Sequence, residues 1–279
     1  MNEFSLGLYE KSMPNTLSLE EKLEEIKRAG FDYLELSIDE SDEKLARLQW
    51  NQGEREALQR VMGEVGVKIL SICLSGNRKY PLGSEDEAVR ERGVEIMRDA
   101  IDLAQDLGIR IIQIAGYDEY YGESNERTRS FFGENLERMV RHAACRGVIL
   151  AFETMETEFM NTVGKAMEYV KQINSPYLQV YPDIGNVANA ALTYGSDPFE
   201  DLESGRGHLA AVHMKETVPG KFREIPYGTG HVDFRKNFQI AADMGVGLFV
   251  GEFWYVGNDD WREQLAFANR FLRDSMKQG

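Results

Sequence analysis

One junction recurs along the chain and constrains its fold more than any other feature: a helical stretch ends at a glycine, and a short apolar run follows at once. Four copies read "RAGFDYLEL", "EVGVKILSI", "DLGIRIIQI" and "CRGVILAFE". A glycine just past a helix adopts the left-handed conformation that closes the helix. We therefore predict helix ends followed by strands at Gly30, Gly66, Gly108, Gly147 and Gly245.

Eight short runs have the apolar, often β-branched composition of buried strands. Between them lie longer stretches whose apolar residues are spaced near the helical period, which predicts helices. The clearest predicted helix is Leu19–Ala29, where Ser18 and Glu21 form the pattern of a capping box. The predicted strands are Phe4–Tyr9, Tyr33–Ile38, Lys68–Leu74, Ile111–Ala115, Ile149–Glu153, Leu178–Pro182, Leu209–Met214 and Leu248–Phe253.

This alternation predicts the fold. Near-continuous apolar strands that alternate with helices are typical of a parallel sheet covered by helices. With no Pro/Ser-rich linker and no break in composition, eight such units predict a single (β/α)8 TIM barrel over residues 1–279, an α/β fold. An open doubly wound sheet is the alternative. It is disfavoured because Leu8-Tyr9-Glu10-Lys11 follows the first strand in place of a glycine-rich phosphate loop.

The charge balance argues against some partners, since 47 acidic and 32 basic residues give a formal net charge of −15. Because so acidic a surface repels a phosphate backbone, we expect no nucleic-acid partner. A small anionic substrate remains compatible with this charge if it binds in a local basic pocket. No run approaches the roughly 20 apolar residues of a membrane span, and Met1–Tyr9 lacks the pattern of a signal peptide. Cys73 and Cys145 are too few for a disulfide framework. We expect a cytoplasmic protein.

Candidate site residues stand at the ends of the predicted strands, because barrels of this kind carry their active sites at the carboxyl ends of the strands. The last four strands place Glu153, Asp183, His213 and Glu252 there. The steps 183 − 153 = 30 and 213 − 183 = 30 each fit one strand–helix unit. A single polar strand end is ordinarily a loop anchor or helix cap. Three carboxylates buried together are costly without a cation, so the set predicts a divalent metal site.

The donor set suggests both the metal and the reaction. Three oxygen donors and one nitrogen suit Mn²⁺, Mg²⁺, Co²⁺ or Zn²⁺, with a lean toward Mn²⁺. Glu153 and Glu252 come from predicted strands three apart in the ring and could flank a ketose from opposite faces. That arrangement favours inversion beside a carbonyl. One carboxylate removes the carbon-bound proton, a metal-stabilised cis-enediolate forms, and the other carboxylate returns a proton.

Several segments together resemble one enzyme family. They read "ILAFETME", "VYPDIGNVANA", "AAVHMKETVPGKFREIPYGTGHVDF" and "VGEFW". They are similar to the L-ribulose-5-phosphate (L-xylulose-5-phosphate) 3-epimerases of the xylose-isomerase-like barrel superfamily, which also holds the ketose 3-epimerases and endonuclease IV. The segments "LGLYEKSMP" and "FDYLELSIDES" extend the likeness over nearly the whole chain. The combination is specific, whereas no single segment is.

The resemblance implies an isomerase that interconverts L-ribulose 5-phosphate and L-xylulose 5-phosphate at C3, in carbohydrate metabolism such as L-ascorbate degradation. It assigns one divalent metal ion to Glu153, Asp183, His213 and Glu252, and proton transfer to Glu153 and Glu252. Asn186 matches a position that touches substrate oxygens in related epimerases. By analogy with the family we also expect a homodimer.

The phosphate of such a substrate needs basic partners, because Arg binds phosphate in a bidentate manner and Lys as a point charge. The segment after the seventh predicted strand offers Lys215, Lys221 and Arg223, with His231 further on, and of these Lys215 and Arg223 are the first choice as substrate-binding residues. Arg78 and Lys79, after the third strand, are a second option. The alternative for all of them is that they are solvated loop charges.

Three other functions remain as alternatives. A hexulose-6-phosphate isomerase or related aldose–ketose isomerase would use the same metal site but move protons between C1 and C2. A DNA-repair endonuclease would need a multi-metal cluster with more histidines than the four present, and its substrate would be repelled by the net charge of −15. A non-catalytic sugar-phosphate-binding protein would not need carboxylates on both faces of its ligand.

Overall fold

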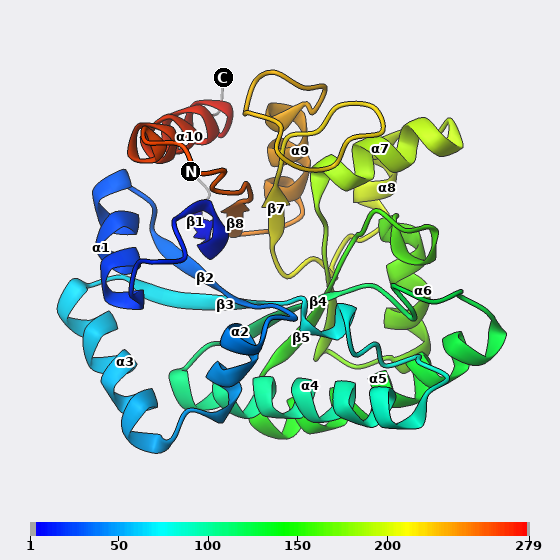
Figure 1. Ribbon diagram of the computed structural model, residues 1–279. Helices are drawn as coiled ribbons and strands as arrows, with labels where there is room; N and C mark the ends of the chain where they lie inside the picture. The colour runs from blue at the N-terminus through cyan, green and yellow to red at the C-terminus, as the bar shows by residue number, and fades with distance from the viewer. Residues whose placement is uncertain (1–3, 278–279) are drawn as a thin grey trace.

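The computed structural model describes residues 4–277 and shows a ring of parallel strands surrounded by helices (Figure 1). The eight strands of this part of the chain are β1 (Ser5–Tyr9), β2 (Tyr33–Ile38), β3 (Lys68–Leu74), β4 (Ile111–Ala115), β5 (Ile149–Glu153), β6 (Leu178–Tyr181), β7 (Val212–Met214) and β8 (Leu248–Gly251). Every strand pair is parallel, in the sheet order β6-β5-β4-β3-β2-β1-β8-β7. The predicted α/β barrel is therefore confirmed.

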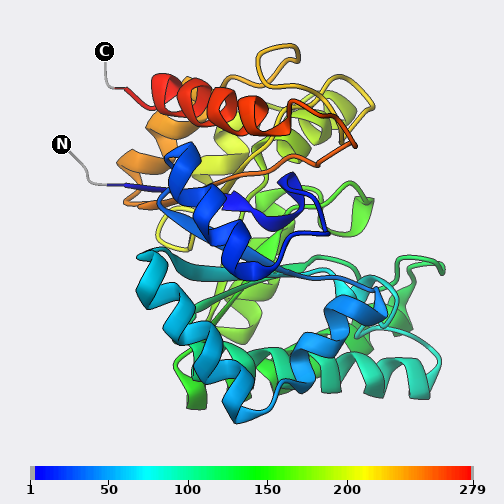
Figure 2. The same ribbon diagram turned by 60° about the vertical axis from the view of Figure 1, so that its left-hand side comes forward.

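The helices lie on the outside of the strands, as both views show (Figures 1 and 2). The α-helices among the described residues are α1 (Leu19–Ala29), α2 (Asp42–Ala46), α3 (Gln52–Val65), α4 (Glu87–Leu107), α5 (Glu126–Arg146), α6 (Val163–Ile173), α7 (Ile184–Tyr194), α8 (Pro198–Glu203), α9 (Phe234–Asp243) and α10 (Trp261–Ser275). Short 3-10 helices are η1 (Glu10–Ser12), η2 (Arg47–Gln49), η3 (Gly76–Arg78) and η4 (Glu158–Met160). No helix described here is long and apolar enough to cross a membrane.

The predicted helix boundaries are confirmed where the sequence had marked them. Ser18 and Glu21 form the predicted capping box at the start of α1. Gly30, Gly66, Gly108 and Gly147 close α1, α3, α4 and α5 in the left-handed conformation, and Gly245, two residues past α9, also has a positive φ. These glycines reverse the chain at the end of the barrel where each strand begins, so the loops at the other end are free to build a site.

Four strands differ from prediction by their ends. β1 begins one residue late, β8 stops at Gly251, and β7 is shortened to Val212–Met214. β6 stops at Tyr181 because Pro182 follows, and a proline has no N–H to donate to the ladder. Within the described part of the chain, the two ends of the sheet are joined only by isolated bridges, Val180 to Leu209 and Asp183 to His213. The ring is therefore closed by the fewest strand contacts between β6 and β7, beside two predicted metal ligands.

Alternation of side chains along the strands divides the core into two layers. On β2, Leu34, Leu36 and Ile38 belong to the large apolar cluster between the strands and the helices. Tyr33 belongs instead to a smaller cluster inside the ring. The inner layer is unusually polar, because Glu35 is also fully buried there. Of the two free cysteines, Cys73 lies in this inner layer, whereas Cys145 is exposed.

Candidate active site

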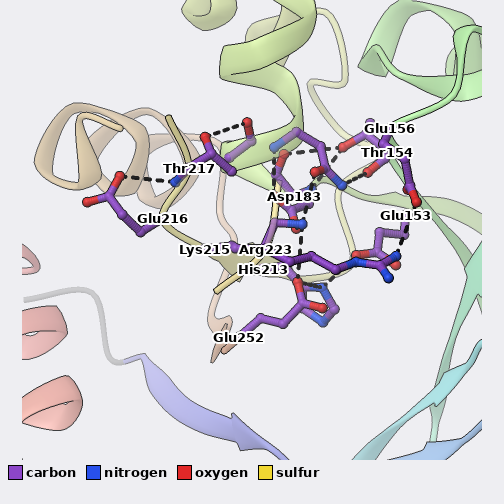
Figure 3. Close-up of polar contacts among 12 residues, drawn as sticks. Glu153, Thr154, Glu156, Asp183, His213, Lys215, Glu216, Thr217, Arg223 and Glu252 are labelled. Carbon is purple, nitrogen blue, oxygen red and sulfur yellow. Dashed lines mark hydrogen bonds and ion pairs between the residues drawn. The ribbon is translucent and has the colours of Figure 1, made fainter. Parts of the chain in front are cut away.

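The four predicted metal ligands converge at the carboxyl ends of β5 to β8 (Figure 3). Glu153 is the last residue of β5, Asp183 precedes α7, His213 lies in β7, and Glu252 follows β8. All four side chains are buried, and one ligand atom from each lies within 4.8 Å of the others. The sequence-predicted set is thus brought together by the fold.

The turn after β6 shows how local sequence prepares the site. Asp183 is the N-cap of α7, and its Oδ1 accepts a hydrogen bond from the Asn186 backbone N–H at 2.8 Å. This leaves Oδ2 directed at the cluster. Gly185 is required by close packing: a Cβ there would lie 2.8 Å from the Lys215 carbonyl oxygen and 2.7 Å from a Thr217 methyl. The sequence Asp-Ile-Gly-Asn therefore lets the start of α7 pack against the segment that follows β7.

Two buried oxygen atoms of the cluster, Asp183 Oδ2 and Glu252 Oε2, make no well-aligned hydrogen bond with the described residues. Their nearest cations are the Lys215 ammonium, which ion-pairs with Asp183 and lies 3.7 Å from Glu252, and the His213 ring. Three buried carboxylates that share only one lysine and one histidine are costly unless a further cation binds them. A divalent cation held by three carboxylates and a histidine fits these residues.

Burial and mutual repulsion control the protonation of the cluster. Burial raises the pKa of Asp183 to about 8, although the nearby Lys215 ammonium opposes the shift. Burial also raises the pKa of Glu153, and the charge of Glu252 adds to that rise. The pKa of Glu252 is lowered despite its burial, since Lys215 and His213 favour its ionised form. Burial would lower the pKa of His213, but the carboxylates around it raise that pKa well above its ordinary value. Without a cation, the cluster therefore retains protons.

The structure places Lys215 and Asn186 deep in the site. The Lys215 side chain is 6 % exposed, and its ammonium donates to Asn186 Oδ1 at 2.9 Å. The Asn186 amide donates in turn to the Thr154 carbonyl oxygen at 2.7 Å. Both residues line the cavity beside Glu153 and Glu252. They lie at the level of the cation site rather than at the mouth.

A second group of polar residues surrounds the mouth of the same cavity. Arg223 is 41 % exposed there and bonds Glu156 at 3.1 Å. Glu156 also accepts a hydrogen bond from Tyr117 at 2.7 Å. Arg78 lines the same cavity, with its guanidinium 4.8 Å from the centre of the Tyr120 ring. Two arginines that approach from different loops make the mouth basic within an acidic protein.

Two buried polar residues of the site were missed by the sequence analysis. Gln113 on β4 donates a hydrogen bond to Glu153, and Glu35 on β2 bonds His213 Nε2 at 2.6 Å. Both stand in the middle of apolar strands. Each lies two residues after a residue that faces the barrel interior, Tyr33 on β2 and Ile111 on β4, and so faces the interior as well. A polar residue at such a position is the signal that could have identified them, because nothing inside a barrel solvates it.

A parallel barrel whose carboxyl-end rim gathers three carboxylates and a histidine beside a polar cavity defines a class of protein: a (β/α)8-barrel enzyme. The chain matches the family model described as "Xylose isomerase-like TIM barrel" over residues 23–274. It is 43% identical over 275 residues to L-ribulose-5-phosphate 3-epimerase UlaE of Escherichia coli O139:H28, with 98% of this chain and 95% of that protein covered. The same-named protein of Escherichia fergusonii is 42% identical over equal shares.

Solved structures of sugar epimerases share the fold. D-allulose 3-epimerase from Methylomonas sp. superposes with a TM-score of 0.79 over 99% of both chains at 17% identity. A structure described as L-ribulose 3-epimerase gives a TM-score of 0.78 at 19% identity, over 98% of this chain and 94% of the other. The chain belongs to the xylose isomerase-like TIM-barrel family and, within it, is a sugar epimerase related to L-ribulose-5-phosphate 3-epimerase UlaE.

Proposed function

We propose that this protein is a divalent-metal-dependent 3-epimerase that interconverts L-ribulose 5-phosphate and L-xylulose 5-phosphate. The observation that carries the proposal is the placement of two carboxylates around one histidine. Glu153 Oε1 lies 3.0 Å and Glu252 Oε2 lies 3.3 Å from His213 Nδ1, and the two residues stand at the ends of different strands, β5 and β8. The names of the curated relatives support the same substrate pair.

The two carboxylates would work as acid and base. A divalent cation bound by Glu153, Asp183, His213 and Glu252 would withdraw electron density from the ketone and its neighbouring hydroxyl, and so acidify the C3–H bond. One of the two glutamates then removes the C3 proton from one face of the sugar, and the other returns a proton to the opposite face. Their roles exchange with the direction of the reaction. Two carboxylates on opposite faces of C3 would favour epimerisation over proton transfer between C1 and C2.

Lys215 and Asn186 suit the sugar oxygens rather than the phosphate. The Lys215 ammonium lies among Asp183, Asn186 and Glu252, where the reacting end of a ketose would bind. Burial disfavours its charge, but the neighbouring carboxylates raise its pKa further above the ordinary value, so the group stays cationic. A fixed positive charge there would stabilise the negative charge that develops when C3 loses its proton.

The phosphate fits the mouth of the cavity better. C3 would bind beside the candidate metal ligands, and C5, which carries the phosphate, lies two carbons further out. Arg223 and Arg78 reach the mouth from separate loops, and Lys11 lines the same cavity. Arg223 is held by Glu156, and Lys11 is paired with Asp39, so both are oriented before a ligand arrives. We therefore assign the phosphate to Arg223, as the sequence suggested, together with Arg78 and Lys11.

The side walls of the cavity exclude water from the reacting carbons. Trp254 packs edge-on against Tyr9, with ring centres 6.2 Å apart, and both line the cavity. Met155 and Phe222 complete the apolar part of the lining. A drier site strengthens each electrostatic contact between the protein and the developing charge.

The deciding experiment is proton NMR of L-xylulose 5-phosphate in D₂O with the metal-loaded protein. Appearance of L-ribulose 5-phosphate with deuterium at C3 is expected. Deuterium at C1 with an aldose product would instead identify the hexulose-phosphate-isomerase type of reaction. If no new sugar forms and no deuterium enters the substrate, both enzyme assignments are refuted for this substrate.

The phosphate assignment predicts a selective loss of affinity. Arg78→Ala and Arg223→Ala should each raise KM for the phosphorylated ketose about 10- to 100-fold, the value of one charged hydrogen-bonding group. The same variants should leave KM for unphosphorylated L-ribulose nearly unchanged. Steady-state kinetics with both sugars measures this, and an equal effect on the two would place the phosphate elsewhere. The cytoplasmic location stays a prediction from the sequence. The metabolic role and the homodimer stay predictions from the family, and sedimentation analysis can test the dimer.

A further inference from the structure

Glu35 lies next to the ligand cluster but is not part of it. It occupies the middle of β2, faces the interior of the barrel and is fully buried. β2 and β7 are three strands apart in the ring, yet Glu35 Oε1 lies 2.6 Å from His213 Nε2. The carboxylate therefore reaches across the inside of the barrel to one of the four candidate metal ligands.

Every oxygen of Glu35 is already in use. Oε1 bonds His213, and Oε2 accepts hydrogen bonds from Ser71 at 2.7 Å and from Tyr181 at 2.9 Å. Asp183 Oδ2 and Glu252 Oε2, in contrast, contact Lys215 and His213 without a well-aligned hydrogen bond from the described residues. Glu35 therefore has no oxygen free to bind a metal, and its hydrogen bonds fix the orientation of the carboxylate.

The contact determines what His213 can present to the cluster. Since Nε2 faces Glu35, Nδ1 is the nitrogen directed at Glu153 and Glu252, at 3.0 and 3.3 Å. The Tyr181 ring packs 4.7 Å from the imidazole, centre to centre, and so limits its rotation. A histidine that binds a metal through one nitrogen generally donates the proton of the other to a carboxylate or carbonyl, which sets its tautomer and orientation.

We propose that Glu35 is a positioning residue for the metal site: it holds the Nε2 proton of His213 so that Nδ1 is the metal-binding atom. This inference rests on the metal site of the proposed function. Ser71 and Tyr181 belong to the same device, because they hold the carboxylate at the distance from which it meets the imidazole. Glu35 itself touches neither substrate nor metal.

The test measures binding of Co²⁺ to the metal-free full-length protein, because Co²⁺ reports its ligand geometry in visible absorption. Glu35→Gln keeps the size of the side chain and removes its charge, whereas Glu35→Asp keeps the charge and withdraws it from the imidazole. Both should weaken Co²⁺ binding about 10- to 100-fold and alter the absorption band. Glu43→Gln, which makes the same chemical change at an exposed position of α2, is the matched control and should bind Co²⁺ as the wild type does.

Circular dichroism of each metal-free variant separates positioning from stability. A merely structural Glu35 would lower the melting temperature while the folded variants kept the Co²⁺ affinity and spectrum of the wild type, and that result would overturn the proposal. If Glu35→Gln does not fold, Glu35→Asp carries the same comparison. If the wild type binds no Co²⁺, the metal site of the proposed function fails as well; if it binds one Co²⁺ per chain and both Glu35 variants bind equally, only this inference fails.

Discussion

Two clusters of buried charge lie at the carboxyl end of the barrel, and they differ in how fully the protein neutralises them. After β1, Glu10 is surrounded by three cations. Its Oε1 accepts from Lys22, Lys44 and Arg47, and its Oε2 accepts from Arg47 and the Ser37 backbone N–H, at 2.6–2.8 Å. After β5 to β8, three carboxylates of the candidate metal site share one histidine and one lysine, and two of their oxygens make no well-aligned hydrogen bond with the described residues.

The difference separates a structural cluster from a functional one. A buried charge whose hydrogen bonds are all made stabilises the loops that meet at it, whereas a cluster left short of positive charge destabilises the empty fold and binds an added cation. The pKa values follow the same division. Burial would raise the pKa of Glu10, but Arg47 and the two lysines hold it well below its ordinary value, while the pKa of Asp183 is raised to about 8.

The largest effect that would sharpen this comparison is catalytic. Glu153→Gln and Glu252→Gln should each lower kcat about 10²–10⁴-fold, because each removes one group that transfers the proton. Turnover is to be measured at saturating metal, with the metal content of each variant determined. Near-normal turnover of a metal-loaded variant would contradict the two-carboxylate mechanism.

Glu10→Gln should lower the free energy of unfolding instead of acting on the catalytic step. It leaves the three cations without their carboxylate, and loss of one partner of a buried ion pair costs about 3–5 kcal/mol. Urea unfolding of the metal-free protein measures this, with the exposed Glu43→Gln as the control that should change little. A Glu10→Gln protein of wild-type stability would remove the distinction between the two clusters.

The clusters should also respond to pH in opposite directions. The depressed pKa of Glu10 gives stability that is present above the ordinary glutamate value and is lost as the pH falls through the lowered one. Asp183, whose pKa rises from 3.8 to about 8, makes the metal-free protein lose stability as the pH rises across that window. Denaturation at several pH values, with and without Mn²⁺, should show that metal restores stability only on the alkaline side.

Metal binding itself should release protons below about pH 8, because Asp183 and His213 must lose theirs before they bind a cation. Metal affinity should therefore rise with pH. Calorimetric titration of the metal-free protein with Mn²⁺ in buffers of different ionisation enthalpy counts the protons directly. An uptake of protons, or an affinity independent of pH between 6 and about 8, would contradict the raised pKa values.

The smallest expected effect has the opposite sign from that of Glu10. Glu153→Gln should stabilise the metal-free protein at neutral pH by roughly 0.5–2 kcal/mol. The reason is that it removes a carboxyl group whose ionised form is disfavoured by burial, as its raised pKa indicates. The same urea experiment applies. Loss of stability would show that Glu153 is already well neutralised without a cation.

The sequence by itself determined the elements and their order. Helix caps such as Ser18–Glu21 and glycines such as Gly30 depend on residues a few positions apart, so local patterns suffice to predict them. The candidate ligands followed from the same logic, because a strand of known direction places its last residue at a known end of the barrel. Glu153, Asp183, His213 and Glu252 therefore needed no knowledge of distances.

Only the tertiary structure decided which charges meet. Glu35 and His213 are 178 positions apart, and Glu10 and Arg47 are 37 apart, so no local pattern relates them. Lys215 follows the same strand as Arg223 but lies at the cation site, while Arg223 lies at the mouth, because the loop between them leaves the barrel wall. Closure of the ring brings inward-facing side chains such as Glu35 and His213 within hydrogen-bonding distance. Packing of α1, α2 and η2 around the end of β1 completes the Glu10 cluster, whereas the ends of β5 to β8 bring together more carboxylates than cations.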